Sequence, residues 1–227
     1  IAGNTNPIEV LNPLAEQFAV MRSSLVGSLL NNLQMNVSRG ATRVRIFEIG
    51  RVFKRDLKIV DSETETGGFL QDLRFGGLAY GQVASDQWAQ TSRWTDFFDV
   101  KGDLERIVAP LQLTTSRCSD HPAMHPGRGA VLSVASVNGT CQEVGFVGEL
   151  HPRLLQDLGL PRAPIVFELS WSLIEQLELP KLSEISKYPL VERDIAIVVN
   201  ASIPAQDILN ALRLASPSLV KRIHLFD

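Results

Sequence analysis

The chain has 227 residues, of which 44% are apolar and 21% charged, a composition typical of a globular protein with one large domain, or one ordinary domain and a smaller second one. The formal net charge of -3 excludes a globally basic nucleic-acid-binding protein but leaves local basic patches open. Because no apolar run approaches the ~20 residues that cross a bilayer, we expect no membrane span.

The first predicted elements are a helix and two strands. Apolar residues recur every four positions, at Leu25, Leu29, Leu33 and Val37. This period predicts an amphipathic helix over residues 22–38, ended by Gly40. A strand over 43–53, an exposed turn at 63–68 and a second strand over 73–83 then predict an antiparallel pair. Glycines in the second strand indicate a bulge or a close backbone approach.

A second helix is predicted where Thr95 or Asp96 can act as the N-terminal cap. Its inner face would carry an apolar stripe made of Phe97, Val100, Leu104, Ile107, Val108 and Leu111. Strands at 130–137 and 142–150 flank Asn138-Gly139, a dipeptide suited to a tight hairpin turn. The spacing therefore predicts a helix followed by a hairpin.

Three short elements complete the first module. The pattern predicts a helix over 152–158 stopped by Gly159, a strand over 164–169, and a helix over about 171–177. Strands in hairpins with helices between them, and no repeating βαβ unit, predict an α+β fold.

A domain boundary is expected near residues 180–189, where two prolines and three charges interrupt the periodicity. We expect a first module at 1–180, a linker at 181–186 and a second unit at 187–227. Within that unit the pattern predicts a strand at 193–200, a helix at 203–215 and a strand at 219–226, the beginning of a β-α-β fold.

The compartment follows from cysteine usage. Cys118 and Cys141 are the only cysteines, and no signal-peptide pattern opens the chain, so a reducing cytoplasm is the simplest location. The chain starts at Ile1 and stops at Asp227 inside an apolar run, so we expect a piece of a longer protein.

Residues 22–58 form a local basic segment. They include eight cations against Glu48 and Asp56, namely Arg22, Arg39, Arg43, Arg45, Arg51, Lys54, Arg55 and Lys58. Such a segment could meet RNA phosphates or an acidic partner. It could equally be a solvated surface, because strand edges carry Lys and Arg as a guard against aggregation.

No metal or catalytic motif stands out. Thiolate and imidazole are zinc ligands, and the candidates are Cys118, His121, His125 and His151. Pro122 and Pro126 prevent a helix from bringing two of these histidines to one face, so we expect no metal site. No G-x-S-x-G motif, P-loop or G-x-G-x-x-G fingerprint is present.

Six motifs occur in an order that resembles the C-terminal half of the bacterial phenylalanyl-tRNA synthetase beta subunit. They read NPLAEQFAVMRSSLVGSLLNNLQMNVSRG, RIFEIGRVF, DFFDVKGDLERIV, HPGRGA, GELHPRLLQDLGL and KYPLVERDIAIVV. The resemblance implies a class II aminoacyl-tRNA synthetase-like antiparallel sheet flanked by helices, followed by the start of a ferredoxin-like anticodon-binding domain. It also implies a catalytic alpha subunit as partner in an (αβ)2 assembly, and ATP, magnesium and tRNA as ligands of the whole enzyme.

The resemblance also implies a nucleotide site that has lost its groups. Arg51 fits the first motif of catalytic subunits, but Lys54 stands where a phosphate-binding arginine is expected, which keeps the charge and loses the fork. Three glycines and a second arginine are replaced by Glu168, Ser170, Ser172 and Glu175. A carboxylate there would turn an attraction of ~2–4 kcal/mol for a triphosphate into a repulsion. We therefore expect a pseudo-catalytic module.

Contact residues are expected in two places. Subunit contact is assigned to the first helix and strand, because class II folds dimerise near the start of the module, with Arg22, Leu25, Leu29, Leu33, Arg45 and Phe47 as candidates. RNA contact is assigned to the second unit, with Lys187, Arg193, Arg213, Lys221 and Arg222 as candidates. Ordinary solvation remains the alternative for these last five.

Two other functions stay open. One is an active class II-like ATP-dependent ligase that uses Arg51, Lys54 and Arg55 at its nucleotide site. The other is a stand-alone RNA-binding module that uses the basic segment. ATP affinity of the chain separates the first alternative from a pseudo-catalytic module, and salt-dependent tRNA binding tests the second.

Overall fold

The computed structural model describes residues 4, 6–62, 66–109, 111–118, 120–135, 141–175, 187–189, 191–215 and 219–226. The chain divides into two compact units, at 1–180 and 181–227, each of which is described by itself. In the described part of the chain, no helix combines the length and the apolar character needed to cross a membrane.

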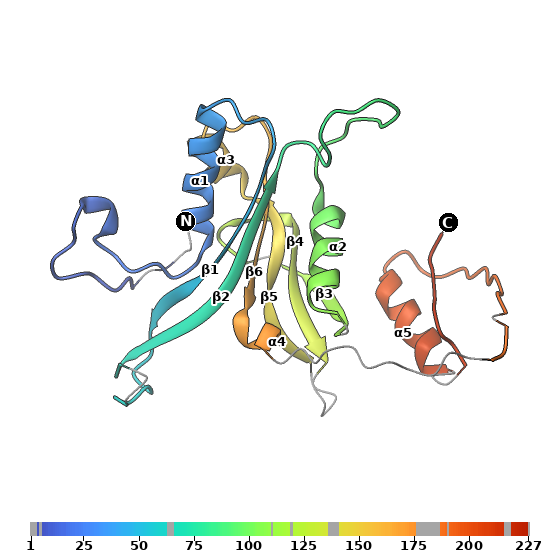
Figure 1. Ribbon diagram of the computed structural model, residues 1–227. Helices are drawn as coiled ribbons and strands as arrows, with labels where there is room; N and C mark the ends of the chain where they lie inside the picture. Colours follow the sequence, from blue (N-terminus) through green and yellow to red (C-terminus); the bar gives the residue numbers. More distant parts are fainter. Residues whose placement is uncertain are drawn as a thin grey trace. The chain divides into compact units, whose positions relative to one another are not determined.

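The first unit is built on one six-stranded sheet (Figure 1). Its strands are β1 (Val44–Arg55), β2 (Phe69–Tyr80), β3 (Leu113–Arg117), β4 (Met124–Ala135), β5 (Cys141–Leu150) and β6 (Ile165–Ser170). They lie in the order β1-β2-β6-β5-β4-β3, and every neighbouring pair is antiparallel. The predicted α+β fold with an antiparallel sheet is confirmed, and the last strand along the chain, β6, lies in the middle of the sheet.

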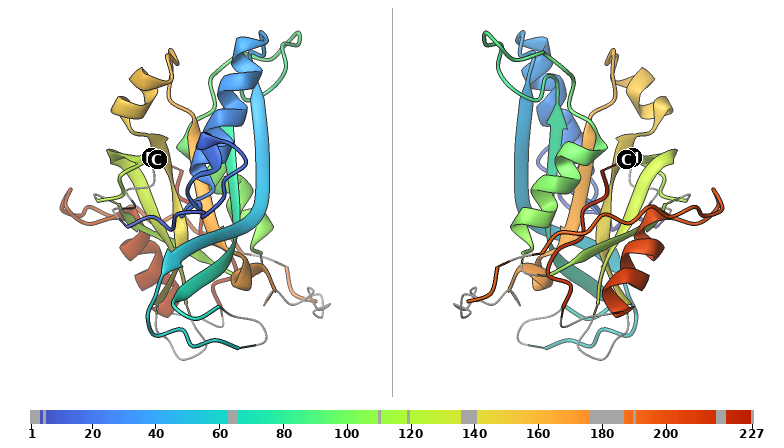
Figure 2. Two further views of the ribbon diagram at one scale, coloured as in Figure 1. Left: turned by 90° about the vertical axis from the view of Figure 1, so that its left-hand side faces the viewer. Right: turned by 90° about the vertical axis from the view of Figure 1, so that its right-hand side faces the viewer.

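One face of the sheet carries α1 (Val26–Ser38) and α3 (Pro152–Asp157), as Figure 2 shows. The apolar stripe of α1 packs on the sheet together with buried residues of β1 and β2, because a helix with a 3.6-residue period buries one side. Gly40 ends the helix with a φ of 87°, which a glycine adopts without strain. Gly159 follows α3 in the same way, with a φ of 64°.

The helix α1 begins four residues later than predicted. The carbonyl of Arg22 accepts a hydrogen bond of 2.8 Å from the amide of Phe53 on β1, which ties this segment to the sheet edge. A backbone group bonded to a strand is unavailable to a helix, so the extended segment runs through Ser24 and the helix starts after Leu25.

The opposite face of the sheet carries α2 (Phe97–Ile107) and α4 (Trp171–Glu175). The side chain of Asp96 accepts from the amide of Asp99 at 3.1 Å, and the side chain of Asp99 accepts from the amide of Asp96 at 2.9 Å. This is a capping box, so Asp96 and not Thr95 is the cap. Ile107 is exposed, so its place in the predicted inner face of α2 was wrong.

The glycines of β2 mark close approaches and no bulge. The β1–β2 register runs without a shift from Val44 opposite Tyr80 to Arg55 opposite Phe69. A Cβ built on Gly77 would collide with the ring of Phe167 on β6. Register shifts occur instead between β4 and β5, whose antiparallel pairing confirms the predicted hairpin strands, while the Asn138-Gly139 turn lies outside the described residues.

The second unit contains one helix among its described residues, α5 (Ala205–Ala215), inside the predicted range 203–215. The segments 193–200 and 219–226, which we expected as strands, form no ladder among the described residues. A strand exists only when its N–H and C=O groups pair with a neighbour, and the described residues offer neither segment a partner.

Candidate functional site

The two cations expected at a nucleotide site lie on opposite faces of the sheet. Side chains alternate along β1, so Arg51 shares a face with Phe47, while Lys54 shares a face with Val52, which belongs to the core under α1. The guanidinium of Arg51 donates to the carbonyl of Gln71 at 2.9 Å. Arg51 and Lys54 therefore do not converge on one phosphate.

Glu168 of β6 is buried, with 5% of its surface exposed. Its Oε2 accepts hydrogen bonds from Ser24 Oγ at 2.7 Å and from the amide of Leu25 at 2.8 Å. The amide lies at the N-terminus of α1, where unpaired N–H groups and the helix dipole favour a carboxylate. Glu168 thus fastens the start of α1 to the middle of the sheet.

The space above Glu168 is filled by the chain itself. Gly76 lies opposite Glu168 on β2, and a Cβ built on Gly76 would lie 3.1 Å from Cβ and Cδ1 of Leu25. Leu25 is fully buried. The absence of a side chain at Gly76 therefore admits Leu25, and this part of the sheet is covered by protein.

The other degenerate positions also bond within the chain. The hydroxyls of Ser170 and Ser172 lie 2.8 Å apart. Arg74, opposite Ser170 on β2, forms an ion pair with Asp72 at 2.8 Å. Glu175 is exposed at the end of α4. These groups form no cluster of unpaired cations among the described residues, which is what a triphosphate would require.

Three of the predicted subunit-contact residues need correction. Leu25, Leu29 and Leu33 are fully buried in the core between α1 and the sheet. Their four-residue period reflects burial against their own sheet. These three side chains therefore offer no surface to a second chain.

The other three candidates keep exposed surface. Arg22 pairs with Glu48, and its Nε donates to the carbonyl of Arg51 at 2.9 Å. Arg45 bonds Asp103 of α2 at 3.1 Å. Phe47 is 71% exposed on an edge strand. Its ring centroid lies 6.0 Å from that of Phe75, which in turn lies 5.3 Å from that of Phe167.

A further exposed apolar surface precedes α1. Residues 6–21, here called the N-terminal arm, project away from α1 in Figure 1. The arm is closed by hydrogen bonds of 2.9 Å from the amide of Val10 to the carbonyl of Ala19 and of 2.8 Å from Met21 to Ile8. Leu11 and Leu14 at its end are 98% and 99% exposed. The sequence reading missed the arm, although the run NPLAEQFAV has apolar residues without a helical or strand period.

The three histidines that were considered and rejected as zinc ligands accept local backbone hydrogen bonds. In each His-Pro pair the imidazole Nδ1 accepts from the backbone amide two residues on, at 3.3 Å for His121, 3.0 Å for His125 and 3.1 Å for His151. No group of three or more potential ligands lies together within the described ranges. Three His-Pro pairs were visible in the sequence and were the signal for this turn.

The imidazole of His121 is partly buried. Its ring packs on Phe146 with centroids 4.1 Å apart. Burial lowers the pKa of His121, and the positive charge of Lys54 lowers it further. Both effects disfavour the imidazolium form of His121.

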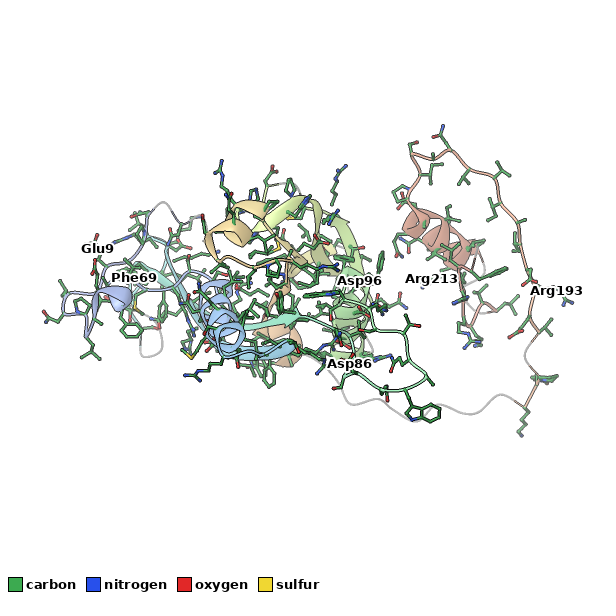
Figure 3. All side chains as sticks on the ribbon, turned by 90° about the horizontal axis from the view of Figure 1, so that it is seen from above. Glu9, Phe69, Asp86, Asp96, Arg193 and Arg213 are labelled. Carbon is green, nitrogen blue, oxygen red and sulfur yellow. The ribbon has the colours of Figure 1, made fainter. Side chains whose placement is uncertain are left out.

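The cations of the second unit are exposed and lie on separate segments. Figure 3 labels Arg193 on the extended segment before α5 and Arg213 within α5. The other three candidates, Lys187, Lys221 and Arg222, are likewise exposed on non-helical segments.

The six-stranded antiparallel sheet with helices on both faces is the α+β architecture expected of a class II aminoacyl-tRNA synthetase-like module. A family model described as the phenylalanyl tRNA synthetase beta chain CLM domain matches residues 2–171. A model of the ferredoxin-fold anticodon binding domain matches residues 186–227. The chain belongs to the phenylalanyl-tRNA synthetase beta chain family.

Curated relatives agree with this assignment. The whole chain matches proteins named phenylalanine--tRNA ligase beta subunit, at 45% identity in Ralstonia nicotianae, 44% in Burkholderia pseudomallei and 43% in Nitrosospira multiformis. The chain spans 28%, 28% and 27% of the length of these three relatives.

Proposed function

We propose that this chain is part of the beta subunit of a phenylalanine-tRNA ligase, which attaches phenylalanine to its tRNA with ATP and magnesium in the cytoplasm. Within that enzyme the chain is a non-catalytic module that packs against the catalytic alpha subunit in an (αβ)2 assembly. We divide it into a pseudo-catalytic module at 1–180, a linker at 181–186 and the start of an anticodon-binding domain at 187–227.

The observation that carries the non-catalytic role is the contact between Glu168 and the start of α1. A nucleotide bound on this part of the sheet would have to displace Leu25 from the core and break two hydrogen bonds to a buried carboxylate. Leaving those donors unpaired costs about 1–3 kcal/mol each. An active ligase built on Arg51, Lys54 and Arg55 is disfavoured, because Arg51 and Lys54 face opposite sides of the sheet.

Exposed apolar side chains support the packing role. Phe47 and Ile49 stand on the uncovered side of the edge strand β1, and Leu11 and Leu14 stand at the end of the N-terminal arm. Large apolar side chains left in water mark surfaces that bind other proteins. We assign subunit contact to this surface, with Arg22 and Arg45 as its polar border.

The second unit would contribute tRNA contact through its exposed cations, Lys187, Arg193, Arg213, Lys221 and Arg222. Phosphate contacts by lysine and arginine lose affinity as salt rises. The nucleotide and magnesium would belong to the alpha subunit's site.

Co-purification with the catalytic alpha subunit tests this function. We expect a stable complex that persists after residues 187–227 are removed. Calorimetry should detect no ATP binding to the chain alone at micromolar concentrations. Micromolar ATP affinity that Arg51→Ala and Lys54→Ala abolish would contradict the non-catalytic role, and salt-dependent tRNA binding without an alpha-subunit complex would favour a stand-alone RNA-binding module.

A further inference from the structure

The loop between β2 and α2, residues 81–95, is fastened at its base and extends beyond the ends of both elements in Figure 1. The amide of Thr95 donates to the carbonyl of Gly81 at 2.9 Å, and the amide of Val83 donates to the carbonyl of Arg93 at 3.0 Å. From outside the loop, the guanidinium of Arg43 donates to the carbonyls of Gln82 and Val83 at 3.1 and 3.2 Å. The 81–95 loop therefore leaves the sheet as a closed ribbon.

The loop carries two tryptophans in opposite environments. Trp94 at the base packs edge-on against Tyr80, with ring centroids 5.3 Å apart, and the guanidinium of Arg162 lies 4.8 Å from its ring. Trp88 at the tip is 93% exposed. Figure 3 labels Asp86, two residues before it, on the part of the loop that stands away from the sheet.

The backbone at the tip holds Trp88 outward. Ala89 has a φ of 64°, and it is the one described residue other than glycine with a positive φ. The side chains of Gln87 and Gln90 hydrogen-bond across the turn. A non-glycine residue in this conformation is strained, and such strain is concentrated where a turn must present a group to a ligand.

The charges of the loop favour a protein over a nucleic acid as its ligand. Asp86 and Arg93 are the only charged residues of the loop. Arg93 donates to both carboxylate oxygens of Asp99, at 2.7 and 2.6 Å, and lies 3.6 Å from Asp96. A base that stacks on tryptophan needs cations nearby for its phosphates. The one cation within the loop, Arg93, is engaged by Asp99, and Arg43 and Arg162 lie at the loop's base, bonded to its backbone and stacked on Trp94.

We propose that the 81–95 loop is a docking element whose Trp88 ring enters an apolar pocket with a neutral polar border on the catalytic alpha subunit. This inference rests on the proposed function. Arg43, which clamps the base of the loop, directly precedes β1, so the loop is anchored at the same end of β1 as the assigned contact residues Arg45 and Phe47. Tryptophan is the side chain most enriched among residues that dominate protein interfaces.

The test is the affinity of the beta subunit for the alpha subunit, measured by calorimetry for wild type and for Trp88→Ala. We expect the variant to bind about 10- to 100-fold more weakly, the usual range for an interface anchor. Its melting temperature should stay at the wild-type value, because Trp88 covers little of the fold. Leu57→Ala is the matched control, since Leu57 is also 93% exposed but lies beyond the far end of β1.

Each alternative result has a separate meaning. Equal affinity of Trp88→Ala and wild type overturns the inference and leaves the proposed function intact. No complex even with wild type overturns both. If Trp88→Ala weakens tRNA binding and not subunit binding, the ligand is RNA and the inference is wrong. If Trp88 in the beta subunit alone is already shielded from acrylamide quenching, another part of the same chain covers it, and the inference is also wrong.

Discussion

The middle of the sheet under α1 and the outer side of β1 use their residues in opposite ways. In the middle, a buried carboxylate, a glycine and a leucine fit together, as Glu168, Gly76 and Leu25 close the surface. At the outer side, Phe47 and Ile49 are exposed, and so are Leu11 and Leu14 of the N-terminal arm. In the closed region the side chains are buried and hydrogen-bonded within the chain. In the open region the apolar side chains remain exposed to water.

The difference suggests a division of roles that the proposed function predicts. The start of α1 binds Glu168 and covers the middle of the sheet, so we expect the stability of the fold to depend on this contact. We expect partner binding to depend on the exposed apolar residues of the open region instead. Four substitutions test this division.

The largest effect is expected from Glu168→Ala, which should lower the free energy of unfolding by about 3 kcal/mol. The variant leaves the amide of Leu25 and the hydroxyl of Ser24 without an acceptor in a buried place, and hydrogen bonds to charged groups contribute about 1.5–3 kcal/mol. Urea unfolding measures the change. Glu105→Ala, which removes an exposed ion pair with Lys101, is the control and should change stability by under ~0.5 kcal/mol. Equal effects would mean that Glu168 has no special role.

Phe47→Asp should act on the open region alone. We expect the affinity for the alpha subunit to fall about 100-fold, because a carboxylate would be buried in an apolar contact, while the free energy of unfolding changes little. Leu57→Asp provides a control at an apolar position that is even more exposed, 93% against 71%, and lies outside the assigned surface. Binding equal to wild type would exclude Phe47 from the interface.

Asp99→Ala should lower the free energy of unfolding by about 1 kcal/mol, because Asp99 completes the capping box of α2 and binds Arg93. The hydrogen bond from Arg93 lowers the pKa of Asp99, with the backbone amide of Asp96 and nearby positive charge contributing. A lowered pKa means that the contribution is present above the unfolded-state value near 4 and is lost as the pH falls through the folded-state value. Thermal melts from pH 6 to pH 2 should therefore converge for wild type and variant. A constant difference across that range would contradict the assignment.

His121→Gln should have the smallest effect, and it should appear only in the pH dependence. Burial and Lys54 lower the pKa of His121, so the folded state takes up its proton less readily than the unfolded state. Wild-type stability should decline as the pH falls from 7 to 5, and the variant should decline less. Parallel profiles would show that His121 does not contribute.

Local features of the fold were predictable because their causes are local. The period of the α1 leucines, the carboxylate cap of α2 and the glycines that end α1 and α3 all depend on residues within a few positions of one another. The sequence could also have shown that Arg51 and Lys54 lie on opposite faces of β1, because the two positions are an odd number of residues apart and side chains alternate along a strand.

The features that the sequence did not predict depend on residues far apart in the chain. Glu168 and the amide of Leu25 are 143 positions apart, so the sequence showed a carboxylate in place of a glycine but not the donor that it binds. The place of β6 between β2 and β5 has no local signature either. The α1 leucines were correctly predicted to line one face, but only the assembled sheet shows that their own chain covers them.

The difference between the closed and the open region is tested most directly by amide hydrogen exchange of this chain, measured once with ATP added and once with the alpha subunit added. We predict that the alpha subunit protects amides in the N-terminal arm, in β1 around Phe47 and at the tip of the 81–95 loop, while ATP alone changes none. Protection by ATP around Leu25, Lys54 and Glu168, with no protection by the alpha subunit at the border, would contradict the account.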